Sequence, residues 1–586
     1  MPSTCTRRRL LKAGLGGCGS LALSDLSTQR LFADSPAQPL ARSAQTTGGV
    51  VTSNSAAASD AGRDVLAAGG NAVDAAIATA LALAVTWPEA GNLGGGGFML
   101  VAPPKGPTIC IDYRETAPRS VTATTFAQHT DRRHPKMVGV PGTVRGLAAA
   151  HQQFGSRPWG ELVAPAIELA RAGCVVDRFL AESINEVLSL AVRSPQVYHA
   201  PLKQIFSHPD QRPWRSGDVL KQPALARTLG RLADEGADEF YAGQTGVQLA
   251  DFLQRHGGLV TREDLLAYKA VARPATQTRF LGFEVCGPPP PSSGGMTIQL
   301  ALQMIEAIGL DDPGDATWTA PNVHRIAEAM RRAFRERAAH LGDPDFVSIP
   351  PNLSSESFAR ELSRSISLER ATDSRQLAGD IPLTIGPPES PDTTHFSVVD
   401  SQGMAVANTY TLEASWGAWL VDPRTGFVLN NEMGDFNWNP GYTNLDGRIG
   451  TAANLVAPGK RMLSSQSPTL VKRDGQTILV TGSPGGRTII NTVLCILVQH
   501  LAFQRPLAQA IAAPRFHHQW LPDRLLLEAT DEGVWESVRE PLEAMGHRVE
   551  QSPYLQGAAH SIAVDPQTRI RIGVADLRRG GSVATT

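Results

Sequence analysis

The sequence predicts a large protein of the α+β class, on three observations. The chain has 586 residues, of which 42% are hydrophobic and 19% charged, so it can bury an extensive core. Residues 140–380 carry helical patterns separated by loops rich in proline and glycine, whereas extended runs begin after residue 392. Separate helical and extended regions are typical of α+β proteins. The formal net charge of −2 gives no electrostatic footprint for nucleic acid, so small ligands are the expected partners.

The first residues have the features of an export signal. Arg7, Arg8 and Arg9 precede a weakly apolar run rich in glycine and alanine, which indicates a twin-arginine signal over residues 1–33. A basic, unstructured tail is the alternative. Residues 34–48, rich in Ser, Ala, Gln and Pro, are interpreted as a linker, with the fold beginning near Gly49. The protein is therefore expected in the periplasm or outside the cell.

Cys18 offers a second route to a membrane, because Leu15-Gly16-Gly17-Cys18 resembles a lipoprotein cleavage box. Lipid anchoring is the less favoured alternative, since the apolar stretch before it is very short. The longest later apolar stretch, 75–87, is too short to span a bilayer. No transmembrane span is expected in the mature protein.

The first helix of the fold is predicted from Asn71, with Asp74 three residues later as the returning acid of a capping box. An Ala- and Leu-rich run follows, and the helix should end before Pro88. The four glycines 94–97 come next and lack the sequence context of a phosphate-binding loop. We interpret them as a site of tight backbone packing.

A β-hairpin is predicted after residue 392. Residues 395–400 and 404–411 are extended runs on either side of Ser401-Gln402-Gly403. A turn centred near Gln402 pairs residues whose numbers sum to about 804, so Thr393 should face Thr411. Such a hydroxyl pair is by itself most often a surface feature.

The sequence that starts this hairpin, Asp392-Thr393-Thr394-His395-Phe396-Ser397-Val398-Val399-Asp400, resembles the start of the small subunit in the γ-glutamyltranspeptidase family, whose members are N-terminal-nucleophile hydrolases. Nine further motifs are similar to the family and occur in its order: residues 69–76, 91–98, 112–115, 140–143, 341–346, 429–433, 463–465, 482–486 and 514–518.

The resemblance implies a four-layer αββα sandwich built from two autoproteolytic fragments. Cleavage between Asp392 and Thr393 would give a large subunit, 49–392, and a small subunit, 393–586, which stay together as a heterodimer. Thr393 would then supply both the nucleophilic hydroxyl and, through its α-amino group with an ordinary pKa of about 7.7–8, the base. No Gly-x-Ser-x-Gly or His-Glu-x-x-His motif occurs in the sequence.

The resemblance also assigns site residues. Thr411 corresponds to the threonine that hydrogen-bonds the nucleophile, and Gly485 and Gly486 correspond to the oxyanion hole. Arg114 corresponds to the arginine that holds the donor's α-carboxylate. The other expected donor contacts are Glu413, Glu432, Asp435, Ser464 and Ser465.

Three positions depart from the family pattern. Glu413 stands where many members have Asn and would favour an ammonium over a carboxylate contact, and Gly434 replaces the first Asp of a common Met-Asp-Asp. Asp446 lies in the 440–452 stretch, which resembles a lid loop, where some relatives have an aromatic residue. These departures leave open a β-lactam side-chain acylase or a poly-γ-glutamate hydrolase on the same scaffold. A catalytically silent binding protein is a third, distant alternative.

The expected substrates are glutathione and other γ-glutamyl compounds as donors, with water, amino acids or short peptides as acceptors. Neither a metal nor an organic cofactor is implied. His517 and His518 are interpreted as structural, since no third ligand stands at a suitable spacing. The six cysteines show no pairing pattern. Four arginines in a helical pattern, Arg331, Arg332, Arg335 and Arg337, are interpreted as a solvated face.

Overall fold

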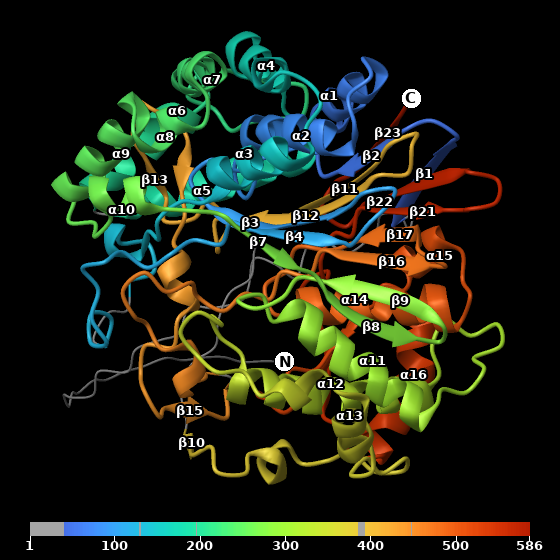
Figure 1. Ribbon diagram of the computed structural model, residues 1–586. Coiled ribbons are helices and arrows are strands. Elements are labelled where there is room, and N and C mark those ends of the chain that lie inside the picture. The colour runs from blue at the N-terminus through green and yellow to red at the C-terminus, as the bar shows by residue number, and fades with distance from the viewer. Residues whose placement is uncertain (1–39, 128–130, 195, 385–392, 447) are drawn as a thin grey trace, which may run out of the picture. The chain divides into compact units, whose positions relative to one another are not determined.

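Two seven-stranded antiparallel sheets lie between two layers of helices in the computed structural model, which describes residues 40–127, 131–194, 196–384, 393–446 and 448–586 (Figure 1). Buried side chains of both sheets, among them Leu100, Ala407 and Leu470, form the core between them. Two larger cores fill the outer layers, each between one sheet and its helices. The four-layer αββα sandwich is thereby confirmed.

The first sheet has the order β23-β2-β11-β12-β3-β4-β7. Its strands are β2 (Val50–Ser53), β3 (Gly96–Ala102), β4 (Ile109–Asp112), β7 (Val271–Pro274), β11 (Thr394–Val399), β12 (Ala405–Thr411) and β23 (Ser582–Thr585). Ten helices cover its outer face: α1 (Ala56–Ala67), α2 (Ala72–Thr86), α3 (Thr143–Phe154), α4 (Trp159–Ala172), α5 (Arg178–Val192), α6 (Ala200–Phe206), α7 (Pro223–Glu235), α8 (Asp238–Tyr241), α9 (Gln244–Arg255) and α10 (Arg262–Ala267).

The second sheet has the order β1-β22-β21-β17-β16-β9-β8. Its strands are β1 (Ala41–Thr46), β8 (Thr276–Phe280), β9 (Phe283–Gly287), β16 (Thr469–Arg473), β17 (Gln476–Thr481), β21 (Ser561–Val564) and β22 (Arg571–Asp576). The helices on its outer face are α11 (Gly294–Ile308), α12 (Ala320–His340), α13 (Glu356–Ser363), α14 (Thr488–Leu497), α15 (Leu507–Ala512) and α16 (Glu532–Ala544).

Short strand pairs lie outside the two large sheets. They are β5 (Cys174–Val175) with β6 (Val219–Leu220), β10 (Leu383–Thr384) with β15 (Thr443–Asn444), β13 (Leu420–Val421) with β14 (Val428–Leu429), and β18 (Phe516–His517) with β19 (Leu525–Leu527) and β20 (Val549–Gln551).

Helix α2 begins as the sequence predicts. The Asn71 side chain accepts hydrogen bonds from the backbone N–H groups of Val73 and Asp74, and Asp74 Oδ2 accepts one from Asn71 N at 2.9 Å, which completes the capping box. Every residue of the helix is buried, because other helices and the sheet pack around it. Its small side chains allow this close packing, and it ends two residues before Pro88.

The hairpin of β11 and β12 also has the predicted register. Thr394 pairs with Tyr410 and Val399 with Ala405, and in both pairs the residue numbers sum to 804. Successive side chains of a strand point to opposite faces. Phe396 and Val398 therefore pack against the helices, whereas Val399 packs between the sheets.

The prediction of a linker over residues 34–48 was wrong in part. Ala41–Thr46 forms the edge strand β1 along β22. Its small and polar residues show no apolar alternation, because this edge strand is held in the sheet mainly by its backbone pairing with β22. The expected signal 1–33, with Cys18, lies outside the described residues, as do residues 34–39 of the linker.

The prediction of a solvated arginine face on α12 was also wrong. Arg331, Arg332 and Arg337 are buried, with exposures of 1%, 3% and 8%. Arg331 and Arg332 both donate to the buried carboxylate of Glu328 on the same helix. Charged residues three and four positions apart pair along a helix, and such pairing lets them enter a core.

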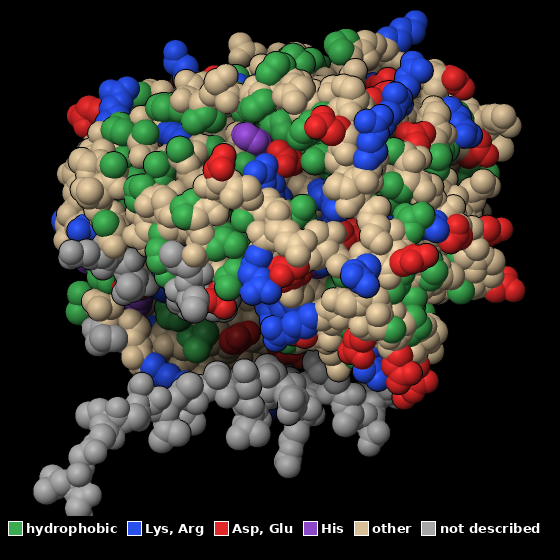
Figure 2. All heavy atoms as spheres, turned by 90° about the horizontal axis from the view of Figure 1, so that it is seen from below, with side chains coloured by type: hydrophobic (Ala, Val, Ile, Leu, Met, Phe, Trp, Pro, Cys, Tyr) green, Lys and Arg blue, Asp and Glu red, His purple; other side chains and the backbone are tan. Residues whose placement is uncertain are grey.

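Cys110, Cys174, Cys286 and Cys495 are buried free thiols. No helix among the described residues is long and apolar enough to cross a membrane. On the face drawn in Figure 2, basic, acidic and apolar side chains of the described residues are interspersed, so this face presents no broad basic patch for nucleic acid.

Candidate active site

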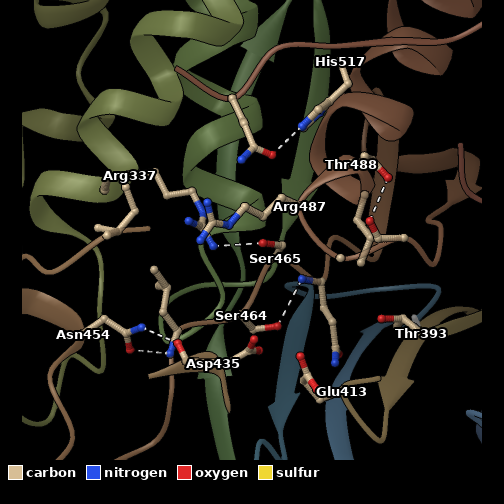
Figure 3. A pocket seen from close by; sticks show the side chains of 18 of the residues that line it. Arg337, Thr393, Glu413, Asp435, Asn454, Ser464, Ser465, Arg487, Thr488 and His517 are labelled. Atoms are coloured by element: carbon tan, nitrogen blue, oxygen red, sulfur yellow. Dashed lines mark hydrogen bonds between the residues drawn. The ribbon is translucent and has the colours of Figure 1, made fainter. Parts of the chain in front are cut away.

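One pocket brings together all the site residues that the sequence analysis named within the described part of the chain (Figure 3). Asp392, the expected residue before the cleaved bond, lies outside the described residues. The pocket is lined by Thr393, Thr411, Gly485, Gly486, Arg114, Glu413, Glu432, Asp435, Ser464 and Ser465. These positions come from segments hundreds of residues apart, so the fold itself assembles the site.

Thr393 directly precedes β11, and Thr411 ends the neighbouring strand β12. The carbonyl oxygen of Thr411 accepts a hydrogen bond from Asn92 Nδ2 at 2.9 Å. A Cβ on Gly95 would lie 2.0 Å from that oxygen, so only glycine allows this approach. The glycine-rich loop therefore packs tightly, as predicted, and it fixes the end of the strand that carries Thr411.

Gly485 and Gly486 form the turn that leads into α14. Their φ angles of +129° and +56° lie where side chains other than glycine are disfavoured. Thr488 Oγ1 donates to Gly485 O at 2.7 Å, and a Cβ on Gly485 would lie 2.6 Å from the same Oγ1. The turn thus stands at a helix N-terminus, where unpaired N–H groups and the helix dipole stabilise negative charge.

Arg114 follows β4 and is a buried cation of the pocket, with 1% exposure. It donates to Glu432 through Nη1 and to Asp435 through Nη2, the latter at 2.5 Å. Its Nε and Nη2 also reach the carbonyl oxygens of Met462 at 3.3 Å and Leu463 at 3.4 Å. The guanidinium is therefore held in one orientation between the two carboxylates that were expected to receive a donor's ammonium group.

Two carboxylates of this cluster are buried where the dielectric constant is low, and this changes their pKa values. Burial raises the pKa of Glu432 well above its ordinary value, and Arg114 offsets this only in part. Burial likewise raises the pKa of Glu115, whose Oε2 lies 3.6 Å from Arg114 Nη1, to about 7. A bound ammonium group would favour the ionised form of these carboxylates.

Another part of the pocket wall is built from Ser464, Ser465 and residues that the sequence analysis did not assign to the site. Ser465 Oγ accepts from Arg337 Nη2 at 2.9 Å, so an arginine expected on a solvated face lies in the pocket instead (Figure 3). Asn454 Nδ2 donates to the backbone oxygen of Asp435 at 2.6 Å. Only the fold brings these residues to the site, since neither stands in a motif.

The three departures from the family pattern all lie at this pocket or beside it. Glu413 Oε1 lies 3.2 Å from Arg132 Nη1, so its carboxylate faces a cation of the chain itself. Gly434 belongs to the 3₁₀ helix η5 (Glu432–Asp435), between the two expected ammonium ligands. Asp446, with Ile449 and Thr451, gives the 440–452 stretch a place in the pocket wall.

The histidines near the site are engaged with protein groups. His517 accepts at Nδ1 from Asn491 Nδ2 and donates from Nε2 to Gln519 Oε1, both at 2.7 Å. Burial lowers its pKa to about 3, so it is neutral. His518 Nε2 lies 3.2 Å from Asp523 Oδ1. These contacts agree with the structural interpretation of both residues.

One group of side chains among the described residues has the spacing of metal ligands, namely His324, Glu328 and His547. His324 Nδ1 and His547 Nε2 lie only 2.7 Å apart and share a hydrogen bond. Glu328 already receives Arg331, Arg332 and Thr372. Two guanidinium groups on the only carboxylate disfavour a bound cation, and the cluster is better explained as a buried hydrogen-bond network.

Comparison with known proteins gives consistent results. A profile of the gamma-glutamyltranspeptidase family matches residues 58–586. The chain is 42% identical over 538 residues to a glutathione hydrolase proenzyme of Escherichia coli (strain K12), covering 90% of both chains. It is 33% identical over 549 residues to the acylase ACY 1 proenzyme of Pseudomonas sp. (strain SE83), covering 91% of this chain and 93% of that one. It is also similar in structure to a cephalosporin acylase from Bacillus halodurans, with a TM-score of 0.80, 26% identity and coverage of 93% and 96%.

Proposed function

The chain belongs to the gamma-glutamyltranspeptidase family, and on that premise we propose that it is a self-processing γ-glutamyltransferase and glutathione hydrolase with Thr393 as its nucleophile. One observation carries the proposal. A single pocket contains a threonine at the start of a strand, a double-glycine turn at a helix N-terminus, and a buried arginine between two carboxylates. The first two features suit acyl transfer, and the third suits the head group of an amino acid.

Maturation is the first reaction that we assign to Thr393. Its hydroxyl oxygen attacks the carbonyl carbon of Asp392, and the peptide C–N bond breaks as the ester forms. Water then hydrolyses this ester, which leaves a carboxylate on Asp392 and a free α-amino group on Thr393. The two fragments, which meet at the cleaved bond between residues 392 and 393, remain one folded unit, because β11 and β12 of the small fragment pair with β2 and β3 of the large one.

In turnover, the α-amino group of Thr393 takes the hydroxyl proton as Oγ bonds to the γ-carbonyl carbon of the donor. The negative charge that develops on the carbonyl oxygen falls at the Gly485–Gly486 turn. The C–N bond then breaks, and the leaving amine takes the proton. Water or the amine of an acceptor attacks the acyl-threonine ester in the same way and regenerates the enzyme.

Specificity for the γ-carbonyl follows from how the head group would bind. Arg114, with Ser464 and Ser465, would hold the α-carboxylate, while Glu432 and Asp435 receive the α-ammonium. Both charged groups of the amino acid are then occupied, so the side-chain carbonyl is the group that reaches Thr393. Glutathione and other γ-glutamyl compounds have this chemistry, and amino acids or short peptides can serve as acceptors.

A glutaryl acylase acting on β-lactam side chains is the second candidate, and a poly-γ-glutamate hydrolase is a variant of it. The similarity to the acylase ACY 1 proenzyme favours this interpretation. The test is turnover of γ-glutamyl-p-nitroanilide beside that of glutaryl-7-aminocephalosporanic acid. We expect a higher kcat/KM for the γ-glutamyl donor, and the reverse order would overturn the assignment.

We further propose that residues 1–33 export the protein through the twin-arginine route to the periplasm or the medium. Lipidation at Cys18 is the alternative. The support is the arginine-rich start followed by a weakly apolar run. Replacing Arg7, Arg8 and Arg9 by Lys should leave the protein in the cytoplasmic fraction. Unchanged export, or incorporation of labelled fatty acid at Cys18, would contradict this route.

A further inference from the structure

Glu413 has a backbone conformation that its surroundings must hold in place. Its φ angle of +80° is rare for any residue except glycine, so the backbone is strained there. The structure shows two contacts that support it. Glu413 N donates to Thr411 Oγ1 at 2.9 Å, and Glu413 Oε1 lies 3.2 Å from Arg132 Nη1. The same residue thus links the catalytic threonine pair to an arginine that does not itself line the pocket.

The guanidinium of Arg132 occupies a slot that depends on Gly434. A Cβ on Gly434 would lie 2.9 Å from Arg132 Nη1 and 3.7 Å from Glu413 Cδ. On another side, the guanidinium carbon lies 5.3 Å from the centre of the Trp438 ring, which stacks on Phe126. Two departures from the family pattern, Glu413 and Gly434, therefore meet at one arginine.

The ion pair between Glu413 and Arg132 affects the balance of charge around the donor subsite. Arg114 already faces Glu432 and Asp435, with Glu115 close by. Glu413 adds another carboxylate, which contributes to the raised pKa of Glu432 after burial, Glu115 and Asp435. Arg337, Arg487 and Arg524 also line the pocket. The carboxylate of Glu413 would nevertheless repel a donor carboxylate close to it unless a neighbouring cation offset its charge. Arg132 lies beside Glu413 and supplies that charge.

We propose that Arg132, Glu413 and Gly434 form one charge-setting unit that makes the donor subsite selective for a head group carrying a carboxylate. Arg132 is a positioning residue that acts through Glu413, and Gly434 provides the clearance that it needs. This inference deepens the proposed function and rests on it, because it concerns the same donor subsite.

The test compares three p-nitroanilides in which the acyl group is γ-glutamyl, glutaryl or 4-aminobutyryl. The second lacks the α-ammonium and the third lacks the α-carboxylate. In Arg132→Gln we expect KM for the two carboxylate-bearing donors to rise about 3- to 10-fold, while KM for the 4-aminobutyryl donor stays the same or falls. Glu413→Gln in the same chain removes the unbalanced charge and should restore the wild-type ratio of KM values.

Gly434→Ala tests the same unit without removing any charge. The added methyl group must displace the flexible end of Arg132, so this variant should change the KM ratios in the same direction as Arg132→Gln, by a smaller amount. Gly230→Ala is the matched control, because its Cβ would meet nothing within 4 Å in α7, and it should match the wild type. Equal changes in KM for all three donors, or a failure of Glu413→Gln to restore the wild-type KM ratio, would overturn this inference but not the proposed function. Absence of γ-glutamyl turnover by the wild type would instead overturn the proposed function.

Discussion

Replacing Arg114 by Lys should weaken recognition of a donor's α-carboxylate without disturbing the acyl-transfer machinery. The guanidinium contacts Glu432 and Asp435 with separate nitrogens and also reaches two backbone carbonyl oxygens. Lysine keeps the positive charge but has a single nitrogen, so it cannot bridge the carboxylates and bind a ligand at once. The variant isolates the geometry of the contact from its charge.

The magnitude follows from the hydrogen bonds that lysine cannot make. A hydrogen bond to a charged group contributes about 1.5–3 kcal/mol, and the variant forms at least one such bond fewer with the donor. Since about 1.4 kcal/mol corresponds to a factor of ten, kcat/KM for γ-glutamyl-p-nitroanilide should fall about 10- to 150-fold.

The assay is steady-state kinetics with γ-glutamyl- and 4-aminobutyryl-p-nitroanilide on protein that has completed its cleavage. We expect the loss for the γ-glutamyl donor only, because the second donor has no α-carboxylate for Arg114 to hold. An equal loss for both donors would refute the role of Arg114 and indicate a general distortion of the pocket. Unchanged kcat/KM for the γ-glutamyl donor would refute it outright.

Three other expectations follow. Gly485→Ala should lower kcat about 10²- to 10³-fold and slow self-cleavage too, because its Cβ would collide with Thr488 and displace the N–H group that we propose as an oxyanion donor. A normal kcat in steady-state assays would contradict this. Burial raises the folded-state pKa of Glu115 to about 7, whereas the unfolded value is near the ordinary 4.5, so the folded state holds more protons between these values and the contribution of Glu115 to stability falls as pH rises from about 4.5 to 7. The side chain of Glu115→Gln does not titrate, so the thermal midpoint of the wild type should fall relative to that of the variant across this range, and parallel profiles would count against it. Asn454→Ala leaves the backbone oxygen of Asp435 without its amide donor, so KM for γ-glutamyl donors should rise about 5- to 30-fold with kcat little changed. A fall in kcat alone would argue against a role of Asn454 in positioning Asp435.

Local sequence patterns were sufficient to predict those elements that depend mainly on residues near each other in the chain. The capping box fixed the start of α2, and the spacing around Gln402 fixed the hairpin register to the residue. The four-layer fold and the site residues came from motifs distributed along the chain. Strand β1 escaped prediction because an edge strand of small polar residues has no apolar alternation to detect.

The residues missed at the site share a physical reason. Arg337 belongs to a helix about 56 residues before Thr393 in the sequence, and Arg132 reaches Glu413 beside Gly434, where a Cβ would lie 2.9 Å from its Nη1. Long side chains can bury their stems and place a charged end far from their own backbone. A helical pattern of arginines therefore indicates where the backbone runs but not whether the charged ends meet solvent, an ion pair or a pocket.

The most direct test of the central claim is the intact mass and amino-terminal sequence of purified wild-type protein and of Thr393→Ala after incubation near neutral pH. We predict that the wild type yields two fragments, the smaller beginning Thr-Thr-His-Phe, and that Thr393→Ala stays a single, inactive chain. A wild-type protein that turns over γ-glutamyl donors as one uncleaved chain, or a Thr393→Ala protein still cut between residues 392 and 393, would contradict the assignment of Thr393 as both the self-cleaving and the catalytic nucleophile.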